Sequence, residues 1–88
     1  MGAKLKLGQP VHVVWLDAQY AKQQVWISRD EAAELPLQPI HALGYVLADE
    51  PDRLTLAAHL GALSAAGVMI IPRGCIAKIT RLTQVKRG

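Results

Sequence analysis

The sequence has little cysteine, few aromatic residues and few charges, and each shortage narrows the class of protein. Its single cysteine, Cys75, excludes an internal disulfide, and no signal peptide is recognisable, so we expect a cytoplasmic protein. Phenylalanine is absent, and the aromatic residues are two tryptophans and two tyrosines. Charged residues make up 19% of the chain, too few for extensive disorder. The 88 residues allow one domain, 1–88, with an ordered body of about 11–83 between basic tails.

Motifs for catalysis, metal binding and phosphate-loop binding are also missing. The glycines have neither the Gly-x-Gly spacing of a dinucleotide loop nor a Gly-Lys-Ser/Thr ending. Ser28 and Ser64 lack the surroundings of a nucleophile. No pair among His12, His41 and His59 has the local spacing of a metal site, so we expect ordinary surface or rim histidines. We therefore expect no enzyme, no metal site and no cofactor.

The sequence does contain short apolar runs with a period of two, in a chain that is 51% hydrophobic. These runs predict five strands, at 11–16, 40–48, 53–60, 68–71 and 76–82. The alternation predicts that one set of side chains points inward: Ile40, Ala42, Val46, Leu54, Leu56, Ala58 and Leu60. Gly44, in the middle of a strand, marks a bend or a close backbone approach.

A capping box predicts one short helix in the arm after the first strand. The Ser28 side chain can accept from the amide of Glu31, and the helix ends at Leu35 because Pro36 follows. We expect Ala32 and Leu35 to pack this helix onto the body of the protein. We also expect Val25 to Ile27 to make an apolar contact, and Trp15 and Trp26 to fill the core or support the helix.

The last third of the chain predicts a closing device of two short strands. Pro72 stops the run from Val68 to Ile71, and a tight Arg73-Gly74 turn leads into the final strand. Gly61 to Gly67 is rich in small residues and is predicted to be a loop. Two alternatives stay open: a soluble helix across 55–66, and, as a minor alternative, a membrane helix in the uncharged span between Arg53 and Arg73.

Residues 69–79, MIIPRGCIAKI, resemble the last strands and the intervening 3₁₀ turn of Src-homology-3 barrels, and the Arg-Gly step of Sm-like proteins. Gly44, Asp49 and Leu56 are loosely similar to the Gly…Asp…Leu of the first Sm motif. The resemblance implies a mainly β chain folded as a five-stranded barrel. It does not imply the uridine pocket of Sm proteins, because Arg53 and Leu54 occupy the region of the RNA-binding Asn.

Residues 11–83 also resemble short accessory proteins encoded by tailed phages and prophages. The resemblance lies in the segments VVWLDA, Trp26-Ile27-Ser28, GYVLADE and IPRGCIAKITRL. It implies a small accessory protein in the cytoplasm of a bacterial host, and no particular activity.

The charge is unevenly distributed, with a net charge of +3 and no acidic residue from Arg73 onward, where Lys86 and Arg87 also lie. A basic end suits an anionic partner such as a nucleic acid or a nucleotide, and it equally suits a solvated tail. The candidate ligand-binding residues are Tyr45, which can stack on a base, and Arg53, Arg73, Lys78 and Arg81. One version of this hypothesis is a protein that sequesters a nucleotide immune signal.

Several apolar side chains fall on the face opposite the predicted core, which favours association. The candidate interface residues are Val14, Leu16, Leu43, Leu47 and Ile71. We therefore predict a non-catalytic, homo-oligomeric binding protein with an anionic ligand. The alternative is an adaptor or an inhibitor of a host enzyme, in which the basic end has no role.

Overall fold

The computed structural model describes residues 4–18 and 26–83. Its elements are β1 (Pro10–Asp17), α1 (Arg29–Ala33), β2 (Gln38–Asp49), β3 (Arg53–Leu60), β4 (Ala65–Pro72), the 3₁₀ helix η1 (Arg73–Cys75) and β5 (Ile76–Arg81). The five predicted strands and the 3₁₀ turn are confirmed. The predicted apolar contact at Val25 and the basic residues Lys86 and Arg87 lie outside the described residues.

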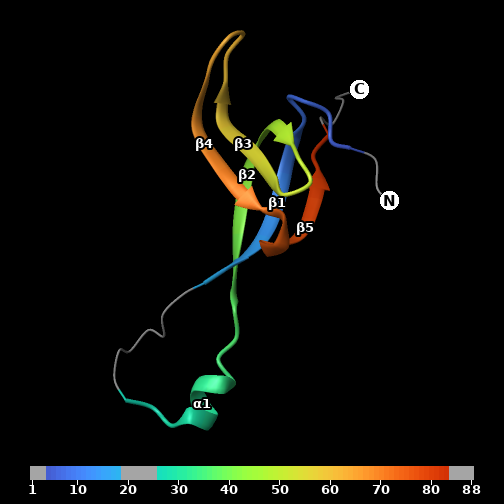
Figure 1. Ribbon diagram of the computed structural model, residues 1–88. Helices are drawn as coiled ribbons and strands as arrows, with labels where there is room; N and C mark the ends of the chain where they lie inside the picture. The colour runs from blue at the N-terminus through green and yellow to red at the C-terminus, as the bar shows by residue number, and fades with distance from the viewer. Residues whose placement is uncertain (1–3, 19–25, 84–88) are drawn as a thin grey trace, which may run out of the picture.

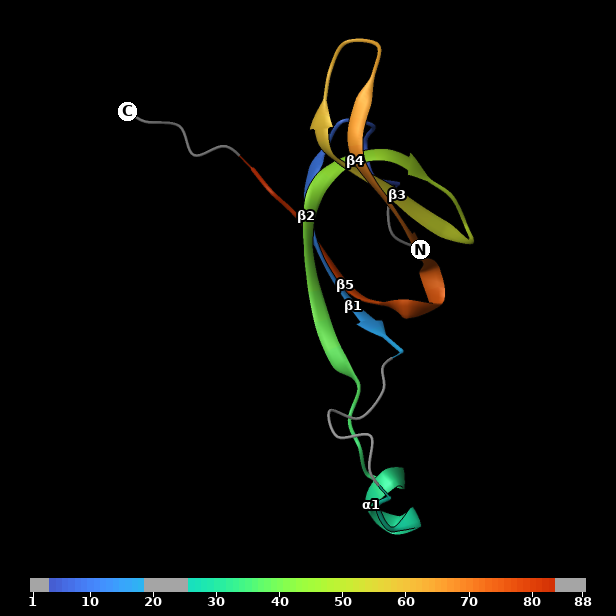
Figure 2. The same cartoon turned by 90° about the vertical axis from the view of Figure 1, so that its left-hand side faces the viewer.

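The strands form one antiparallel sheet in the order β4-β3-β2-β1-β5 (Figure 1). The sheet is strongly curved, and η1 carries the chain from β4 at one edge to β5 at the other (Figure 2). In the described part of the chain β4 and β5 do not pair, so the barrel predicted from the sequence is not closed. The chain is mainly β, as expected.

The strand β2 belongs to both halves of the curved sheet. Its first part, Gln38 to Tyr45, pairs with β1, whereas its last part, from Tyr45 to Asp49, pairs with β3. At Gly44 a Cβ atom would approach the Ala57 carbonyl oxygen to 3.0 Å and the Leu56 Cβ to 3.1 Å, whereas the irregularity in the β2–β3 register lies between Val46 and Ala48. The prediction of a close backbone approach at Gly44 is therefore confirmed.

The core fills the concave side of the sheet. Its fully buried members are Val11, Val13, Val46, Leu54, Leu56 and Ile71, whereas Ala57 is buried on the other face of β3. Ala58 and Leu60, which were predicted to point inward, are exposed because β3 extends beyond β2 after Ala57 and pairs there with β4 alone. Ile40, also predicted inward, is exposed as well, on the part of β2 that β3 does not reach.

The span between Arg53 and Arg73 is a β-hairpin. β3 and β4 pair along their length and a short loop, 61–64, joins them, so the helix considered for 55–66 does not form. The predicted loop 61–67 is shorter than expected, because Ala65 to Gly67 already belong to β4. No helix among the described residues is long and apolar enough to cross a membrane.

A projecting arm, residues 26–37, carries α1 away from the sheet (Figures 1 and 2). The predicted cap is confirmed, since the Glu31 amide donates to the Ser28 Oγ over 3.1 Å. The predicted packing is wrong: α1 has no buried residue, Leu35 is exposed, and Trp26 is 102% exposed. Trp15, by contrast, is partly buried against the core. The arm is exposed because the sheet ends before it reaches the helix.

Candidate functional site

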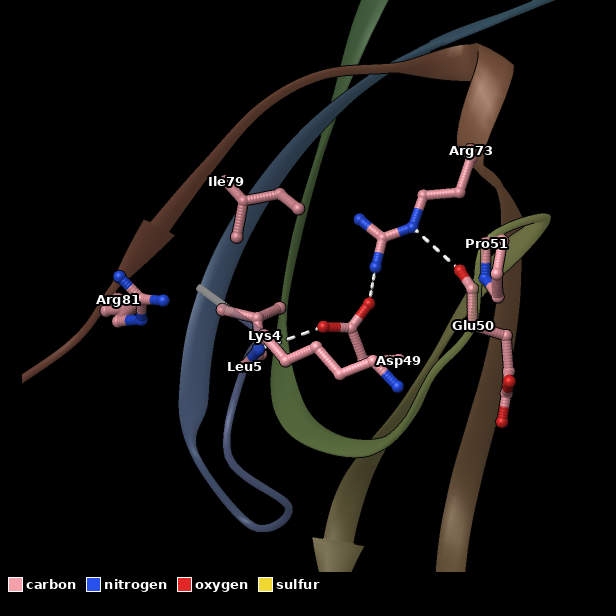
Figure 3. A pocket seen from close by; sticks show the side chains of 8 residues that line it. All are labelled: Lys4, Leu5, Asp49, Glu50, Pro51, Arg73, Ile79 and Arg81. Carbon is pink, nitrogen blue, oxygen red and sulfur yellow. Dashed lines mark hydrogen bonds and ion pairs between the residues drawn. The ribbon is translucent and has the colours of Figure 1, made fainter. Parts of the chain in front are cut away.

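A hollow of about 440 Å³ lies at the end of the sheet where the β2–β3 turn meets η1 (Figure 3). We call it the open-end hollow. It is lined by Lys4, Leu5, Asp49, Glu50, Pro51, Arg73, Ile79 and Arg81. These residues come from the start of the described chain, from the β2–β3 turn and from the closing segment. The fold thus gathers charged side chains that are far apart in the sequence.

The N-terminal segment reaches the hollow because it is bonded to β2. The Gly8 amide donates to the Val46 carbonyl over 2.7 Å, and the Val46 amide donates to the Gln9 carbonyl over 2.9 Å. Leu5 packs against the core, and its amide donates to the Asp49 Oδ2 over 2.9 Å. These contacts hold Lys4 at the wall of the hollow.

Arg73 is the centre of a polar cluster in the hollow. Its guanidinium forms an ion pair with Asp49, and its Nε donates to the Glu50 carbonyl over 3.1 Å (Figure 3). Its own amide donates to the Asp52 carbonyl over 3.0 Å. The Arg73 side chain is 28% exposed and the Asp49 side chain 12%. Arg73, predicted to bind a ligand, therefore joins η1 to the β2–β3 turn, and its charge is matched by Asp49.

The wall opposite this cluster is basic. Arg81, at the end of β5, stands apart from the Arg73–Asp49 pair, and the Glu50 carboxylate points away from Arg73 (Figure 3). The lining of the hollow thus holds three basic side chains, from Lys4, Arg73 and Arg81, and two acidic ones, from Asp49 and Glu50. Lys4 was not among the predicted site residues, because it precedes the first strand and only the bonds to β2 bring it here.

The other predicted ligand residues do not join Arg73 and Arg81. Arg53 begins β3 at the surface, and its Nη1 lies 3.8 Å from the Oδ2 of Asp52, the residue before it. Lys78 is opposite Val14 in the β1–β5 register, on the convex face. Tyr45 is exposed, as predicted, and lines a second hollow of about 430 Å³ together with His59 and the β3–β4 loop. The five residues thus occupy four separate places.

The predicted interface residues differ in exposure, and one of them is buried in the core. Leu43 is 69% exposed, and Val14, Leu16 and Leu47 are half-buried. Ile71 was wrongly placed outside: it is 1% exposed, because it pairs with Leu54 and cross-strand partners share a face. Cys75, the single cysteine, is half-buried.

The edge strand β4 carries three exposed apolar residues in a row, Val68, Met69 and Ile70, which we call the edge patch. Val68 and Ile70 lie on one face of the strand and Met69 on the other. β4 contains no charged residue from Ala65 to Pro72. The sequence signal for this patch is the long uncharged span before Arg73.

No group of three or more His, Cys, Asp or Glu side chains in the described ranges 4–18 and 26–83 is arranged to hold a metal ion. Neither a family model, nor a curated protein, nor a solved structure matches the chain. The resemblances to phage accessory proteins and to the Src-homology-3 and Sm families therefore stay predictions.

Proposed function

We propose that this protein is a non-catalytic binding module that acts as a homo-oligomer and binds an anionic ligand, a nucleotide or a nucleic acid, in the open-end hollow. The observation that carries the proposal is the gathering of three basic side chains, Lys4, Arg73 and Arg81, at one hollow that holds two acidic ones. A phosphate group would complement the net positive charge of this lining.

The backbone geometry supports a small-barrel fold of the Src-homology-3 or Sm kind. The strand order β4-β3-β2-β1-β5 and the 3₁₀ turn between the last two strands fit that architecture. A sheet of this kind that is open between β4 and β5 has two edges on which further strands can add. We infer that a second copy of the chain pairs with one of these edges.

The edge patch supports self-association. Edge strands are normally protected by charges or prolines, but β4 has no charge and its single proline, Pro72, stands at its end. Burial of a large apolar side chain such as Val68, Met69 or Ile70 stabilises an assembly by about 1.5–3 kcal/mol each. β5 carries Lys78 and Arg81, so β4 is the edge that drives association.

A fluorescence-anisotropy titration at low salt tests the ligand, with a labelled single-stranded oligoribonucleotide and, as a competitor, ATP. Both Lys4→Glu and Arg81→Glu are expected to weaken binding at least about 10-fold and to reduce its salt dependence. Lys6→Glu is the matched control, because Lys6 is exposed and does not line the hollow. Absence of binding by the unaltered protein, or an equal loss in the control, would sink the proposal.

A phage accessory role, in which the module sequesters a nucleotide signal of host immunity, is the version of this function that we favour. Its support is the phage-like sequence segments together with the basic hollow. In the titration, this version predicts that small nucleotides displace the oligoribonucleotide. An oligoribonucleotide that ATP and other nucleotides do not displace contradicts the nucleotide version and leaves nucleic acid as the ligand.

A second candidate function is a protein–protein adaptor or an inhibitor of a host enzyme, and the arm favours it. Trp26, Ile27, Leu35 and Leu37 are exposed there, on a segment that contacts no core. A host protein captured by this protein after nuclease treatment and at high salt would support the adaptor, because phosphate-driven binding weakens steeply with salt. Trp26→Ala should abolish that capture, whereas Arg81→Glu should not change it.

A further inference from the structure

Two of the three histidines meet on the convex face of the sheet. His12 lies on β1 opposite Leu43, and His41 lies on β2 opposite Val14, so the two histidines are diagonal neighbours on one face. The His12 Nε2 and the His41 Nδ1 are 2.9 Å apart. Neither residue belongs to the open-end hollow, and 28 residues separate them along the chain. The contact therefore depends on strand register alone.

The two imidazoles meet edge to edge. Their planes differ by only 9° and their centroids are 5.1 Å apart. That separation is close to the sum of the 2.9 Å distance between the nitrogens and the distances from each nitrogen to its ring centroid. The two nitrogens therefore lie on the line between the centroids, so the rings are nearly coplanar and the nitrogens point at each other. One nitrogen must then donate a proton to the lone pair of the other. The contact therefore holds one N–H and one lone pair, and it offers two lone pairs only when that proton has left the donor nitrogen.

A metal ion can take the place of the shared proton. Imidazole nitrogens bind Zn²⁺, Cu²⁺ and Ni²⁺ well, with metal–nitrogen distances of about 2.0–2.1 Å. Two such ligands at a right angle, as in the tetragonal geometry of Cu²⁺ or Ni²⁺, lie about 2.9 Å apart. The separation of the His12 Nε2 and the His41 Nδ1 equals this value. Because the two nitrogens point at each other, both rings must turn before their lone pairs meet at one ion.

The surroundings of the pair leave room for such an ion. His41 is exposed and His12 is half-buried, so water has access to complete the coordination sphere. The neighbouring strand positions carry Leu43 and Tyr45 on β2 and Thr80 on β5, none of them charged at neutral pH. The nearest cation in the register is Lys78, which is opposite Val14 and is therefore a diagonal neighbour of His12 on the same face, across from His41. We propose that His12 and His41 form a two-histidine chelating site for a divalent transition-metal ion, with Cu²⁺ and Ni²⁺ preferred to Zn²⁺.

Isothermal titration of the full chain with Ni²⁺, in a buffer that does not bind metals, tests the site. We expect one ion per chain, with affinity at least about 10-fold weaker in His12→Asn and in His41→Asn. His59→Asn is the control, because His59 is the remaining histidine and lies on β3, away from the pair. The control should bind Ni²⁺ like the unaltered protein.

A measurement on the unaltered protein removes any dependence on how the variants fold. In nitrogen-15 spectra of the imidazole rings, Zn²⁺ should shift the signals of His12 Nε2 and His41 Nδ1 and leave those of His59 in place. The proposal is wrong if Ni²⁺ and Zn²⁺ do not bind at millimolar concentration, or if His59→Asn weakens binding as much as His12→Asn does. Ring signals that shift equally for all three histidines also contradict it.

Discussion

The curved sheet and the projecting arm treat apolar side chains in opposite ways. In the sheet, Val11, Leu54 and Ile71 are almost completely buried. In the arm, every residue from 26 to 37 is exposed, although Trp26, Leu35 and Leu37 are as apolar as the core. The difference teaches that the apolar character of a residue does not decide whether it is buried within one chain, because strand pairing decides that. The apolar residues that remain exposed are the candidates for contacts with a partner.

The largest effect is expected from removing core volume. Ile71→Ala should lower the free energy of unfolding by about 2–5 kcal/mol, because it leaves a cavity beneath Leu54. Leu35→Ala, the matched change in the arm, should alter it by less than about 0.5 kcal/mol. Urea unfolding followed by circular dichroism, at one fixed protein concentration, measures both. Similar losses in the two variants would show that the arm belongs to the folded unit.

A smaller effect is expected from the polar cluster that joins η1 to the β2–β3 turn. Asp49→Ala removes both the ion pair with Arg73 and the acceptor of the Leu5 amide, and should cost about 1–3 kcal/mol. Asp52→Ala is the control, since the Asp52 carboxylate is 73% exposed and lies 3.8 Å from Arg53. The same urea experiment reports on both. If Asp49→Ala unfolds like the control, the cluster contributes nothing to the free energy of unfolding.

The part of the β3–β4 hairpin beyond the core gives a more local test. Gly67 has a φ of +64°, and an added Cβ would lie 2.8 Å from the Ala58 Cβ. Gly67→Ala should therefore cost about 1–2 kcal/mol, whereas Gly74→Ala, where an added Cβ meets nothing within 4 Å, should be nearly neutral. Thermal unfolding compares the two. Equal midpoints would mean that the end of the hairpin unfolds separately from the sheet.

The smallest global effect is expected in the arm. Ser28→Ala removes the cap of α1 and should weaken that helix by about 1 kcal/mol. The free energy of unfolding of the sheet should not change, because α1 has no buried residue. Hydrogen exchange of the Glu31 amide, compared with amides of β1, separates the local loss from a global one. Faster exchange in β1 as well would couple the arm to the sheet.

The sequence predicted the elements well, because each depends on local chemistry. The Ser28 cap and the stop at Pro72 are backbone effects within a few residues, and both appear in the structure, as does the close backbone approach at Gly44. The strand pattern likewise revealed Val46, Leu54 and Leu56 as core residues. The predicted burial of side chains beyond the paired region, such as Leu60, was wrong. The alternation along β3 does not show where the pairing with β2 ends.

The candidate site was predicted only in part, because it depends on long-range contacts. Arg73 and Arg81 were predicted as ligand-binding residues, and both line one hollow. The partner of Arg73, Asp49, and the third basic residue, Lys4, were not predicted, because only long-range contacts bring them to the hollow. The meeting of His12 and His41 has the same origin, since the β1–β2 register places them side by side. Neither the residues of the hollow nor the two histidines have a spacing in the sequence that predicts their contact.

Sedimentation velocity of the protein with a labelled oligoribonucleotide at low salt tests the central claim most directly, since it reports assembly and ligand binding together. We predict that the label sediments with a protein species heavier than the 9.5 kDa chain. We also predict that Ile70→Lys, which places a charge on the β4 edge, reduces that species to the single chain. A protein that sediments at 9.5 kDa at all concentrations, with the label sedimenting alone, would contradict the account.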